Sequence, residues 1–255
     1  MAIPRCLTIA GSDSGGGAGI QADLKAFAAA GCFGMTAIVA LTAQSTLGVS
    51  AVHELPPRFV RAQLEAVLSD IGVDAAKTGM LFSRELIGTV AEVLAEQRVA
   101  PLVVDPVMVA SSGAKLLQDD AVQTLVDLLF PLATVVTPNL PEAEALAGRS
   151  ASRAELAERI HELGAPAVIV TGGHGEDAVD HLFDGREHVE IEVERHDVPA
   201  THGAGCTHSA TLAALLARGE SLEDAARGAA RVASEAVRNG LTEIGAGEGP
   251  VNVLA

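Results

Sequence analysis

Aromatic residues are scarce in this sequence, which has no tryptophan, no tyrosine and six phenylalanines among 255 residues. Proteins that bind single-stranded nucleic acid usually stack bases on aromatic side chains, so this composition argues against such a platform. Basic residues are also few, because 17 Lys and Arg face 33 Asp and Glu, which gives a net charge of −16. We find no Lys/Arg cluster of the kind that nucleic-acid binders carry. We therefore expect no nucleic-acid partner, and any phosphate binding has to come from local backbone chemistry.

Long apolar runs are absent too, although 49% of the residues are hydrophobic. None approaches the roughly 20 residues that a membrane-spanning helix needs, and Met1–Cys6 lacks the long apolar segment of a secretory signal. We therefore expect no membrane association and a cytoplasmic location. The three cysteines, Cys6, Cys32 and Cys206, have neither metal-ligand spacing nor an even count, which argues against a zinc site or a disulfide framework.

Short apolar runs alternate with stretches of helical periodicity along the chain. The expected strands are Leu7–Ala10, Met35–Leu41, Ala75–Thr78, Leu102–Val104, Thr134–Thr137 and Ala167–Val170. The expected helices are Ile20–Ala30, Phe59–Leu68, Leu86–Leu94, Val122–Leu129, Ala154–Leu163, Cys206–Ala217 and Leu222–Asn239. Strands that are apolar on both faces predict an α/β fold, with a mostly parallel sheet between helices. Asp177–Phe183 and His188–Val193 predict a small antiparallel hairpin, and without a repeat or linker one domain over residues 1–255 fits best.

Ligands bind at the carboxyl ends of the strands in such a sheet, so strand-to-turn junctions are the candidate functional segments. The first is Ala10–Gly19, a glycine-rich loop before a helix. It lacks the Lys of a Walker A loop, because Ala18 follows Gly17. It also lacks the acidic residue of a dinucleotide-binding fingerprint near the end of the second strand. The loop is either a flexible turn or a place where the backbone approaches a small ligand closely.

Two further junctions carry carboxylates. Asp105 follows a buried strand, where it can hold Mg²⁺ or polarise a hydroxyl, or simply cap a turn. Pro138 ends the next strand, and Glu142 then falls in the first turn of a helix, where a carboxylate often serves only the helix dipole. Alternatively, Asn139 and Glu142 together can present a carbonyl and a carboxylate to a Mg²⁺–phosphate unit.

The fourth junction is His202–Thr207, which reads HGAGCT immediately before an apolar helix. Backbone N–H groups at a helix start, with glycines that allow close approach, form an anion hole. Cys206 falls in the first turn, where we expect the helix dipole to lower the pKa of the thiol and make some thiolate available. The alternative is a glycine-rich turn followed by a buried cysteine that acts as a small hydrophobic residue.

Taken in order, these segments resemble the ribokinase-like superfamily, and specifically the hydroxymethylpyrimidine/phosphomethylpyrimidine kinases. The resemblance runs from Leu7 to about Asn239. Its most specific stretches are AGSDSGGGAGIQADLKAF, ALTAQST, KTGML, VDPVMVA, VTPNLPEAE and THGAGCT. The implied activity is ATP-dependent, Mg²⁺-dependent phosphorylation of a small-molecule pyrimidine for thiamin biosynthesis, first to the monophosphate and then to the diphosphate.

At the pyrimidine, the resemblance implies that Gln44 reads the ring edge, since its amide offers one donor group and one acceptor. It places Gly11, Met80 and Val107 around the ring, with Asp23 nearby.

At the phosphates, the resemblance implies that Glu142 and Asp105 hold Mg²⁺. It assigns the anion hole to the amides of Gly203, Ala204, Gly205 and Cys206, and it makes Cys206 the candidate base. The residues implied to contact ATP are Asn139, Thr171 and Gly173.

One position departs from the family pattern, because many relatives carry Lys where this chain has Thr171. Threonine only hydrogen-bonds, so the neutralising charge has to come from Mg²⁺ and the anion hole, or from His174 or another group. His208 is also atypical, and we assign it no role.

Two alternatives stay open. A pyridoxal/pyridoxine kinase shares the Gly-Cys anion hole, but its members tend to lack the glutamine found here at position 44. A non-catalytic pyrimidine sensor is disfavoured by the presence of Cys206, Glu142 and Asn139. The family commonly dimerises, so we also expect a homodimer.

Overall fold

The computed structural model describes residues 2–109, 113, 116–118, 120–173 and 178–255. Within these ranges the chain forms one nine-stranded sheet with the order β3-β2-β1-β4-β5-β6-β7-β8-β9. The strands are β1 (Arg5–Ser12), β2 (Phe33–Ser45), β3 (Gly48–Glu54), β4 (Ala75–Thr78), β5 (Leu102–Val104), β6 (Val135–Val136), β7 (Val168–Val170), β8 (Val179–Phe183) and β9 (His188–Glu192). Neighbours from β2 to β7 pair in parallel, whereas β3, β8 and β9 pair antiparallel with the strand before them.

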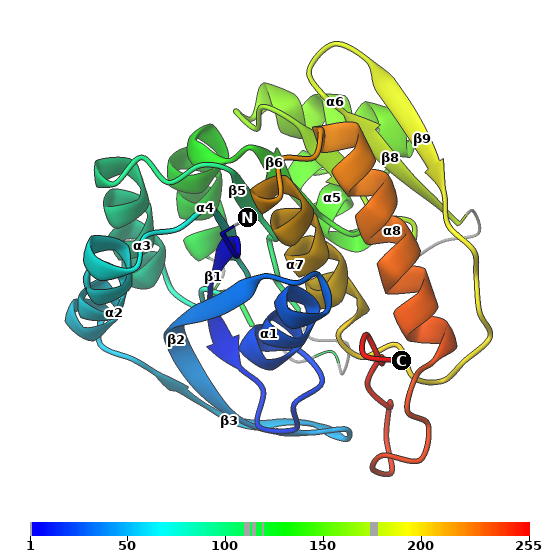
Figure 1. Ribbon diagram of the computed structural model, residues 1–255. Helices are drawn as coiled ribbons and strands as arrows, with labels where there is room; N and C mark the ends of the chain where they lie inside the picture. The colour runs from blue at the N-terminus through cyan, green and yellow to red at the C-terminus, as the bar shows by residue number, and fades with distance from the viewer. Residues whose placement is uncertain (1, 110–112, 114–115, 119, 174–177) are drawn as a thin grey trace.

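Helices cover both faces of this sheet (Figure 1). They are α1 (Gly19–Ala29), α2 (Pro57–Asp70), α3 (Arg84–Glu96), α4 (Ala121–Leu129), α5 (Leu140–Ala147), α6 (Arg153–Glu162), α7 (Ala204–Ala217) and α8 (Leu222–Arg238), with a short 3-10 turn at Phe130–Leu132. Helices α1, α7 and α8 share one buried apolar cluster, and α2 to α6 share the other. Among the described helices, none has the length and hydropathy that a transmembrane segment requires.

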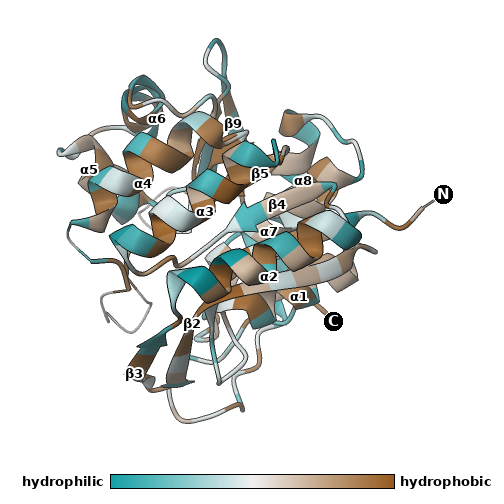
Figure 2. Ribbon diagram, turned by 90° about the vertical axis from the view of Figure 1, so that its left-hand side faces the viewer, coloured by the Kyte–Doolittle hydropathy of each residue, from teal (hydrophilic) through white to brown (hydrophobic). Residues whose placement is uncertain are grey.

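The strands separate these two clusters by simple alternation. Leu7 and Ile9 of β1 point into the cluster of α2 to α6, whereas Cys6 points into the cluster of α1, α7 and α8. Successive side chains of a strand face opposite sides of the sheet, so a strand with helices on both sides is apolar throughout. Figure 2 shows the complementary pattern on α2 and α3, where hydrophilic and hydrophobic residues alternate along the ribbon.

The predicted α/β class, the parallel strands and the antiparallel hairpin are confirmed, although Asp177 at the start of the hairpin lies outside the described residues. One strand, β3, was not predicted. Its residues are exposed or half-buried at the edge of the sheet, so no apolar pattern marks them. The second strand is also longer than predicted. β2 continues to Ser45 because β3 pairs with its second half, and this extension carries Gln44 over the sheet edge.

Candidate active site

A cavity of about 840 Å³ lies at the carboxyl ends of the parallel strands, beside the N-terminus of α7. All but one of the predicted site residues line it. They are Gly11, Gln44, Met80, Asp105, Val107, Asn139, Glu142, Thr171, Gly173, Gly203, Ala204, Gly205 and Cys206. The parallel sheet produces this convergence, because strands distant in sequence end at the same edge.

The floor of the cavity requires a glycine at position 11. The Gly11 N–H donates to the carbonyl oxygen of Met80 at 3.1 Å. A Cβ at this position would lie 2.2 Å from the Met80 methyl carbon, much closer than any real contact. Gly11 therefore lets β1 and the Met80 side chain meet beneath the ligand space, and a larger residue would push Met80 into it.

Gln44 extends from the end of β2 over one end of the cavity. Its amide lies between the hydroxyl of Thr42, at 3.1 Å, and Nε2 of His202, at 3.4 Å. Its backbone is held by Ser14, whose hydroxyl accepts from the Gln44 N–H and donates to the Gln44 carbonyl, both at 2.8 Å. The amide is therefore already positioned in the ligand-free protein.

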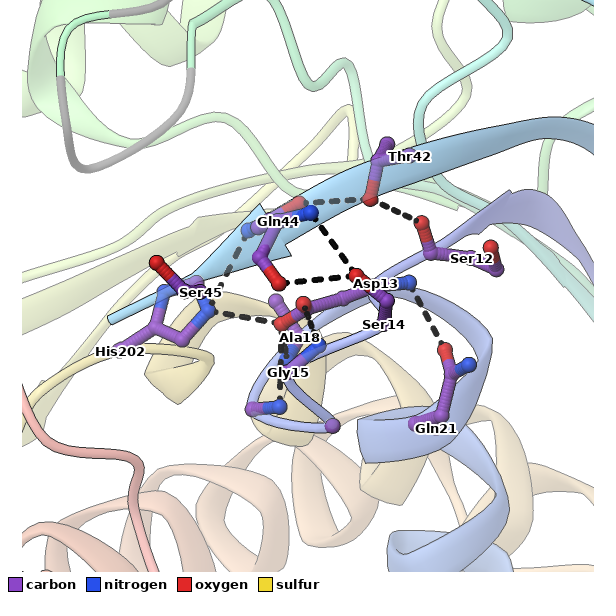
Figure 3. A network of polar contacts seen from close by, with 12 residues as sticks. Ser12, Asp13, Ser14, Gly15, Ala18, Gln21, Thr42, Gln44, Ser45 and His202 are labelled. Carbon is purple, nitrogen blue, oxygen red and sulfur yellow. Dashed lines mark hydrogen bonds and ion pairs between the residues drawn. The ribbon is translucent and has the colours of Figure 1, made fainter. Parts of the chain in front are cut away.

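The glycine-rich loop is organised by Asp13, which the sequence analysis did not single out (Figure 3). One carboxylate oxygen accepts from the Gly15 N–H at 2.7 Å, and the other accepts from the Gly17 and Ala18 N–H groups at 3.0 and 2.8 Å. His202 Nε2 lies 2.9 Å from the second oxygen. The loop is therefore wrapped around a buried carboxylate that holds three of its N–H groups, which argues against the flexible-turn interpretation.

A buried charge network that includes Asp23 lies next to the cavity. Asp23 is fully buried and does not line the cavity. Its carboxylate accepts from the Lys77 ammonium at 2.8 Å and from the Thr8 hydroxyl at 2.6 Å. Residue 23 lies on the inner face of α1, one layer below the ligand space, so its role is to hold Lys77.

Lys77 itself was missed as a site residue. It is fully buried on β4, lines the cavity, and lies 3.7 Å from Asp105 as well as 2.8 Å from Asp23. Burial works to lower the pKa of Lys77, but the charges of Asp23, Cys206 and Asp105 outweigh it and raise the pKa. The side chain is therefore a permanent positive charge at the bottom of the cavity.

Two buried carboxylates, Asp105 and Glu142, face the cavity. Burial and the nearby charge of Asp105 raise the pKa of Glu142 to about 8, against the opposing hydrogen bonds from the Asn139 and Met108 N–H groups. Burial also raises the pKa of Asp105, against the charge of Lys77 and a 2.8 Å hydrogen bond from Ser209. If both groups were ionised, the pair would carry more negative charge than its protein surroundings neutralise, which is why both pKa values are raised.

Asn139 and Glu142 form a capping box at the start of α5. The Asn139 side-chain oxygen accepts from the Glu142 N–H at 2.9 Å, and the Glu142 carboxylate accepts from the Asn139 N–H at 3.0 Å. The predicted carbonyl of Asn139 thus serves the helix cap rather than the cavity. Its amide NH₂ is the group that remains for a ligand.

The N-terminus of α7 opens into the cavity. Gly203 occupies the N-cap position with φ +86°, and no side-chain cap is found there among the described residues. A Cβ on Gly203 would lie 1.9 Å from the Gly17 carbonyl oxygen, so this glycine packs the two glycine-rich loops together. The Ala204 N–H donates to the Thr201 carbonyl at 3.0 Å. The other N–H groups of the first turn and the positive end of the helix dipole together make an anion site.

Cys206 lies in the first turn of α7, as predicted, but the predicted direction of its pKa shift is wrong. Burial, together with the charges of Asp23 and Asp105, raises the pKa of the thiol to about 12, although Lys77 and the Gly19 N–H oppose this. The helix dipole is a weaker influence than desolvation beside two carboxylates. The thiol is therefore protonated in the ligand-free protein.

Thr171 also lines the cavity, and its N–H donates to the Pro138 carbonyl at 2.9 Å. The neighbouring Gly172 N–H donates to Asp180, which also contacts His208 Nε2 at 3.0 Å. Both Asp180 and His208 line the cavity, and neither was predicted as a site residue. His174, considered as a replacement for the family lysine, lies outside the described residues.

The donor set bears on the predicted metal. In the part of the chain that the structure describes, no group of three or more His, Cys, Asp and Glu side chains has the arrangement of a metal site. Mg²⁺ rarely uses such a cage, since it usually takes one or two carboxylates together with water and substrate phosphates. Asp105 and Glu142, with their raised pKa values and unbalanced charge, fit that kind of site.

Comparison with known proteins gives a consistent result. The family model described as phosphomethylpyrimidine kinase matches residues 13–252. The hydroxymethylpyrimidine/phosphomethylpyrimidine kinase of Bacillus subtilis is 47% identical over 262 residues, covering 100% of this chain and 96% of that protein. The thiamine biosynthesis bifunctional protein ThiED of Geobacter sulfurreducens is 50% identical over 96% of this chain, which spans only 51% of that longer protein.

Solved structures confirm the ribokinase-like fold. The ADP complex of Bacillus subtilis pyridoxal kinase matches with a TM-score of 0.90 and 40% identity, covering 98% of this chain and 97% of that one. The phosphomethylpyrimidine kinase of Clostridium difficile matches with a TM-score of 0.81 and 40% identity, covering 92% and 99%. The chain therefore belongs to the phosphomethylpyrimidine kinase family and is a phosphotransferase.

Proposed function

We propose that the protein transfers the γ-phosphoryl group of ATP to the hydroxymethyl oxygen of 4-amino-5-hydroxymethyl-2-methylpyrimidine, and then phosphorylates the monophosphate to the diphosphate. The observation that carries the proposal is that Gln44 and the uncapped N-terminus of α7 line one cavity. A pyrimidine reader and an anion site facing the same space are what such a transfer needs. We also propose a single kinase domain over residues 1–255. A cytoplasmic location and a homodimer stay predictions.

At the pyrimidine end, Gln44 pairs with the aminopyrimidine edge, because the ring offers an amino donor beside a nitrogen acceptor. Met80, Val107 and the bare backbone of Gly11 form the floor and walls around the ring. This enclosure fixes the hydroxymethyl group relative to the N-terminus of α7, and such positioning supplies much of the rate enhancement in phosphoryl transfer.

At the phosphate end, the amides of Gly203, Ala204, Gly205 and Cys206 receive the travelling phosphoryl group. The NH₂ group of Asn139, the hydroxyl of Thr171 and the backbone of Gly173 contact the other phosphates of ATP. Lys77 adds a fixed positive charge below them. These groups stabilise charge that spreads over the phosphoryl oxygens in the transition state.

Asp105 and Glu142 would hold Mg²⁺. The cation would supply positive charge to the phosphates. Cys206 serves as the base that takes the hydroxymethyl proton. Its thiol, with a pKa of about 12 in the ligand-free protein, has to lose its own proton before it can do so.

A steady-state assay with ATP, Mg²⁺ and the pyrimidine, following both the monophosphate and the diphosphate, tests the activity. We expect Cys206→Ala to lose about 100-fold or more in turnover while it still binds the pyrimidine. Cys32→Ala is the matched control, because it removes a buried thiol that does not line the cavity. Near-normal turnover of Cys206→Ala would remove this residue from the base role.

Pyridoxal or pyridoxine is the alternative substrate, favoured by the structural similarity to a pyridoxal kinase. The presence of Gln44 argues for the pyrimidine. Turnover of the two substrates, compared under the same conditions, decides between them, and a strong preference for pyridoxal would overturn the proposed substrate.

A further inference from the structure

The Gln44 amide lies between the side chains of Thr42 and His202, and His202 in turn contacts Asp13. His202 Nε2 lies 2.9 Å from Asp13 Oδ2 and 3.4 Å from Gln44 Nε2, and the Thr42 hydroxyl lies 3.1 Å from Gln44 Oε1 (Figure 3). Asp13 and His202 are nearly buried, with side-chain exposures of 3% and 12%. The proton positions in this group decide which end of the Gln44 amide carries its oxygen.

Asp13 determines the proton on His202. The Asp13 carboxylate accepts three backbone N–H groups, and although burial works to raise its pKa, the His202 and backbone hydrogen bonds lower it. It is therefore ionised and only accepts hydrogen bonds. At 2.9 Å from this oxygen, Nε2 of His202 has to carry a hydrogen, because two lone pairs would otherwise face each other. This single hydrogen is directed to Asp13, and the Gln44 amide, 3.4 Å away, can only share it. An Nε2 that carries a hydrogen cannot accept one from an amide NH₂ group.

Thr42, at the other end of the amide, requires the same orientation of Gln44. Its hydroxyl has one hydrogen and lies 2.8 Å from the Ser12 carbonyl oxygen, which only accepts. With its hydrogen directed to Ser12, the hydroxyl oxygen can only accept from Gln44. Two independent acceptors, the Asp13 carboxylate and the Ser12 carbonyl, therefore require the same arrangement of the amide, with its oxygen and nitrogen exchanged relative to the positions drawn in Figure 3.

We propose that Asp13–His202 and Thr42 are specificity-determining residues, which orient the Gln44 amide with its oxygen toward His202 and its NH₂ group toward Thr42. This fixes the order in which an acceptor and a donor face the ring edge of the substrate. A 4-aminopyrimidine, with a donor amino group beside an acceptor nitrogen, matches one order. A 4-oxopyrimidine, with an acceptor oxygen beside a donor N–H, needs the reverse. The inference rests on the proposed function only in its choice of ligand.

The orientation is tested without any substrate. Nitrogen-15 NMR of histidine-labelled protein reports which ring nitrogen of His202 carries the hydrogen, and His202→Gln identifies the signal by its loss. We expect a hydrogen on Nε2 in the ligand-free protein. An unprotonated Nε2 would overturn the proposal, whatever the enzyme phosphorylates.

The effect on specificity is tested by kinetics with the 4-amino and 4-oxo pyrimidines. We expect the wild type to prefer the amino compound by at least about 100-fold in kcat/KM, since the oxo compound leaves both groups of Gln44 mispaired. His202→Leu removes the donor and lets the amide turn, so the preference falls below about tenfold. His202→Gln restores a donor nitrogen at the same reach and keeps the preference.

Thr42→Val provides a second variant that preserves the shape of strand β2. We expect it to weaken the preference in the same direction, with Thr36→Val as the control, because Thr36 lies on the same strand outside the cavity. A wild-type preference retained in both His202→Leu and Thr42→Val would refute the proposal. If the wild type turns over neither pyrimidine, the proposed function and the ligand specificity fall together, while the NMR result still decides the amide orientation.

Discussion

Glu142→Gln is the substitution whose effect on stability follows most directly from the site. In the ligand-free protein, burial and the charge of Asp105 raise the pKa of Glu142 from its ordinary value of 4.5 to about 8. Because the folded-state pKa lies above the unfolded-state value, the proton stabilises the fold. That contribution is complete below about pH 4.5 and is lost as the pH rises through 8. Glutamine resembles the protonated carboxyl and does not titrate, so the stability of the Glu142→Gln variant should not fall in this way as the pH rises.

The magnitude follows from the two pKa values. At about pH 6 the folded protein holds a proton on Glu142 that the unfolded chain does not hold, and by about pH 8 roughly half of this proton is lost. At about 1.36 kcal/mol per pH unit, this integrates to about 2 kcal/mol. We expect the free energy of unfolding of the wild type to fall by about 2 kcal/mol more than that of Glu142→Gln over this range.

Urea denaturation at the two pH values, without divalent cations, measures this difference. Glu144→Gln is the matched control, since it removes a carboxylate from the same helix outside the cavity. If wild type and Glu142→Gln show the same change with pH, the reasoning about an uncompensated buried carboxylate is refuted.

Three further predictions concern the groups around this carboxylate. Lys77→Met leaves the Asp23 carboxylate buried without its cation, and we expect the free energy of unfolding in urea to fall by about 3 to 5 kcal/mol. The double variant Asp23→Leu/Lys77→Met should recover most of this loss. A Lys77→Met variant as stable as the wild type would contradict the buried pair. Gly203→Ala forces a side chain into left-handed backbone against the Gly17 carbonyl, so we expect at least about 1 to 3 kcal/mol of destabilisation, whereas Gly205→Ala meets no atom within 4 Å and should melt like the wild type. Mg²⁺ should lower the pKa of the Cys206 thiol, which the pH dependence of iodoacetamide alkylation measures with and without Mg²⁺–ADP; an unchanged profile would separate the metal site from the thiol.

The parts of the fold that were predictable are those with a strong local pattern. β4 and β5 are short, wholly buried strands, and their predicted bounds are those that the structure has. β3 was not predictable in this way, because an edge strand with exposed side chains has no such pattern. The hairpin of β8 and β9 was predictable from the Asp184-Gly185 turn between two strand-like runs.

The site was predictable where a motif ends a strand, and unpredictable where it depends on a distant partner. Lys77 in the middle of a four-residue buried strand was a usable signal, since a buried ammonium needs a buried carboxylate. Nothing local indicated that this carboxylate would be Asp23, 54 residues earlier. Asp13 and His202 are 189 residues apart and meet only because β1 ends and α7 begins at the same edge of the sheet. The thiol pKa was misjudged for the same reason, because the helix dipole is local whereas the neighbouring carboxylates are not.

A crystal structure with the pyrimidine and a non-hydrolysable ATP analogue tests the central claim most directly. The account predicts the pyrimidine edge on Gln44 and the γ-phosphate on the amides from Gly203 to Cys206. The hydroxymethyl oxygen should lie about 3 to 3.5 Å from the γ-phosphorus, in line with its leaving oxygen. A pyrimidine bound away from Gln44, or a γ-phosphate that makes no contact with the start of α7, would contradict it.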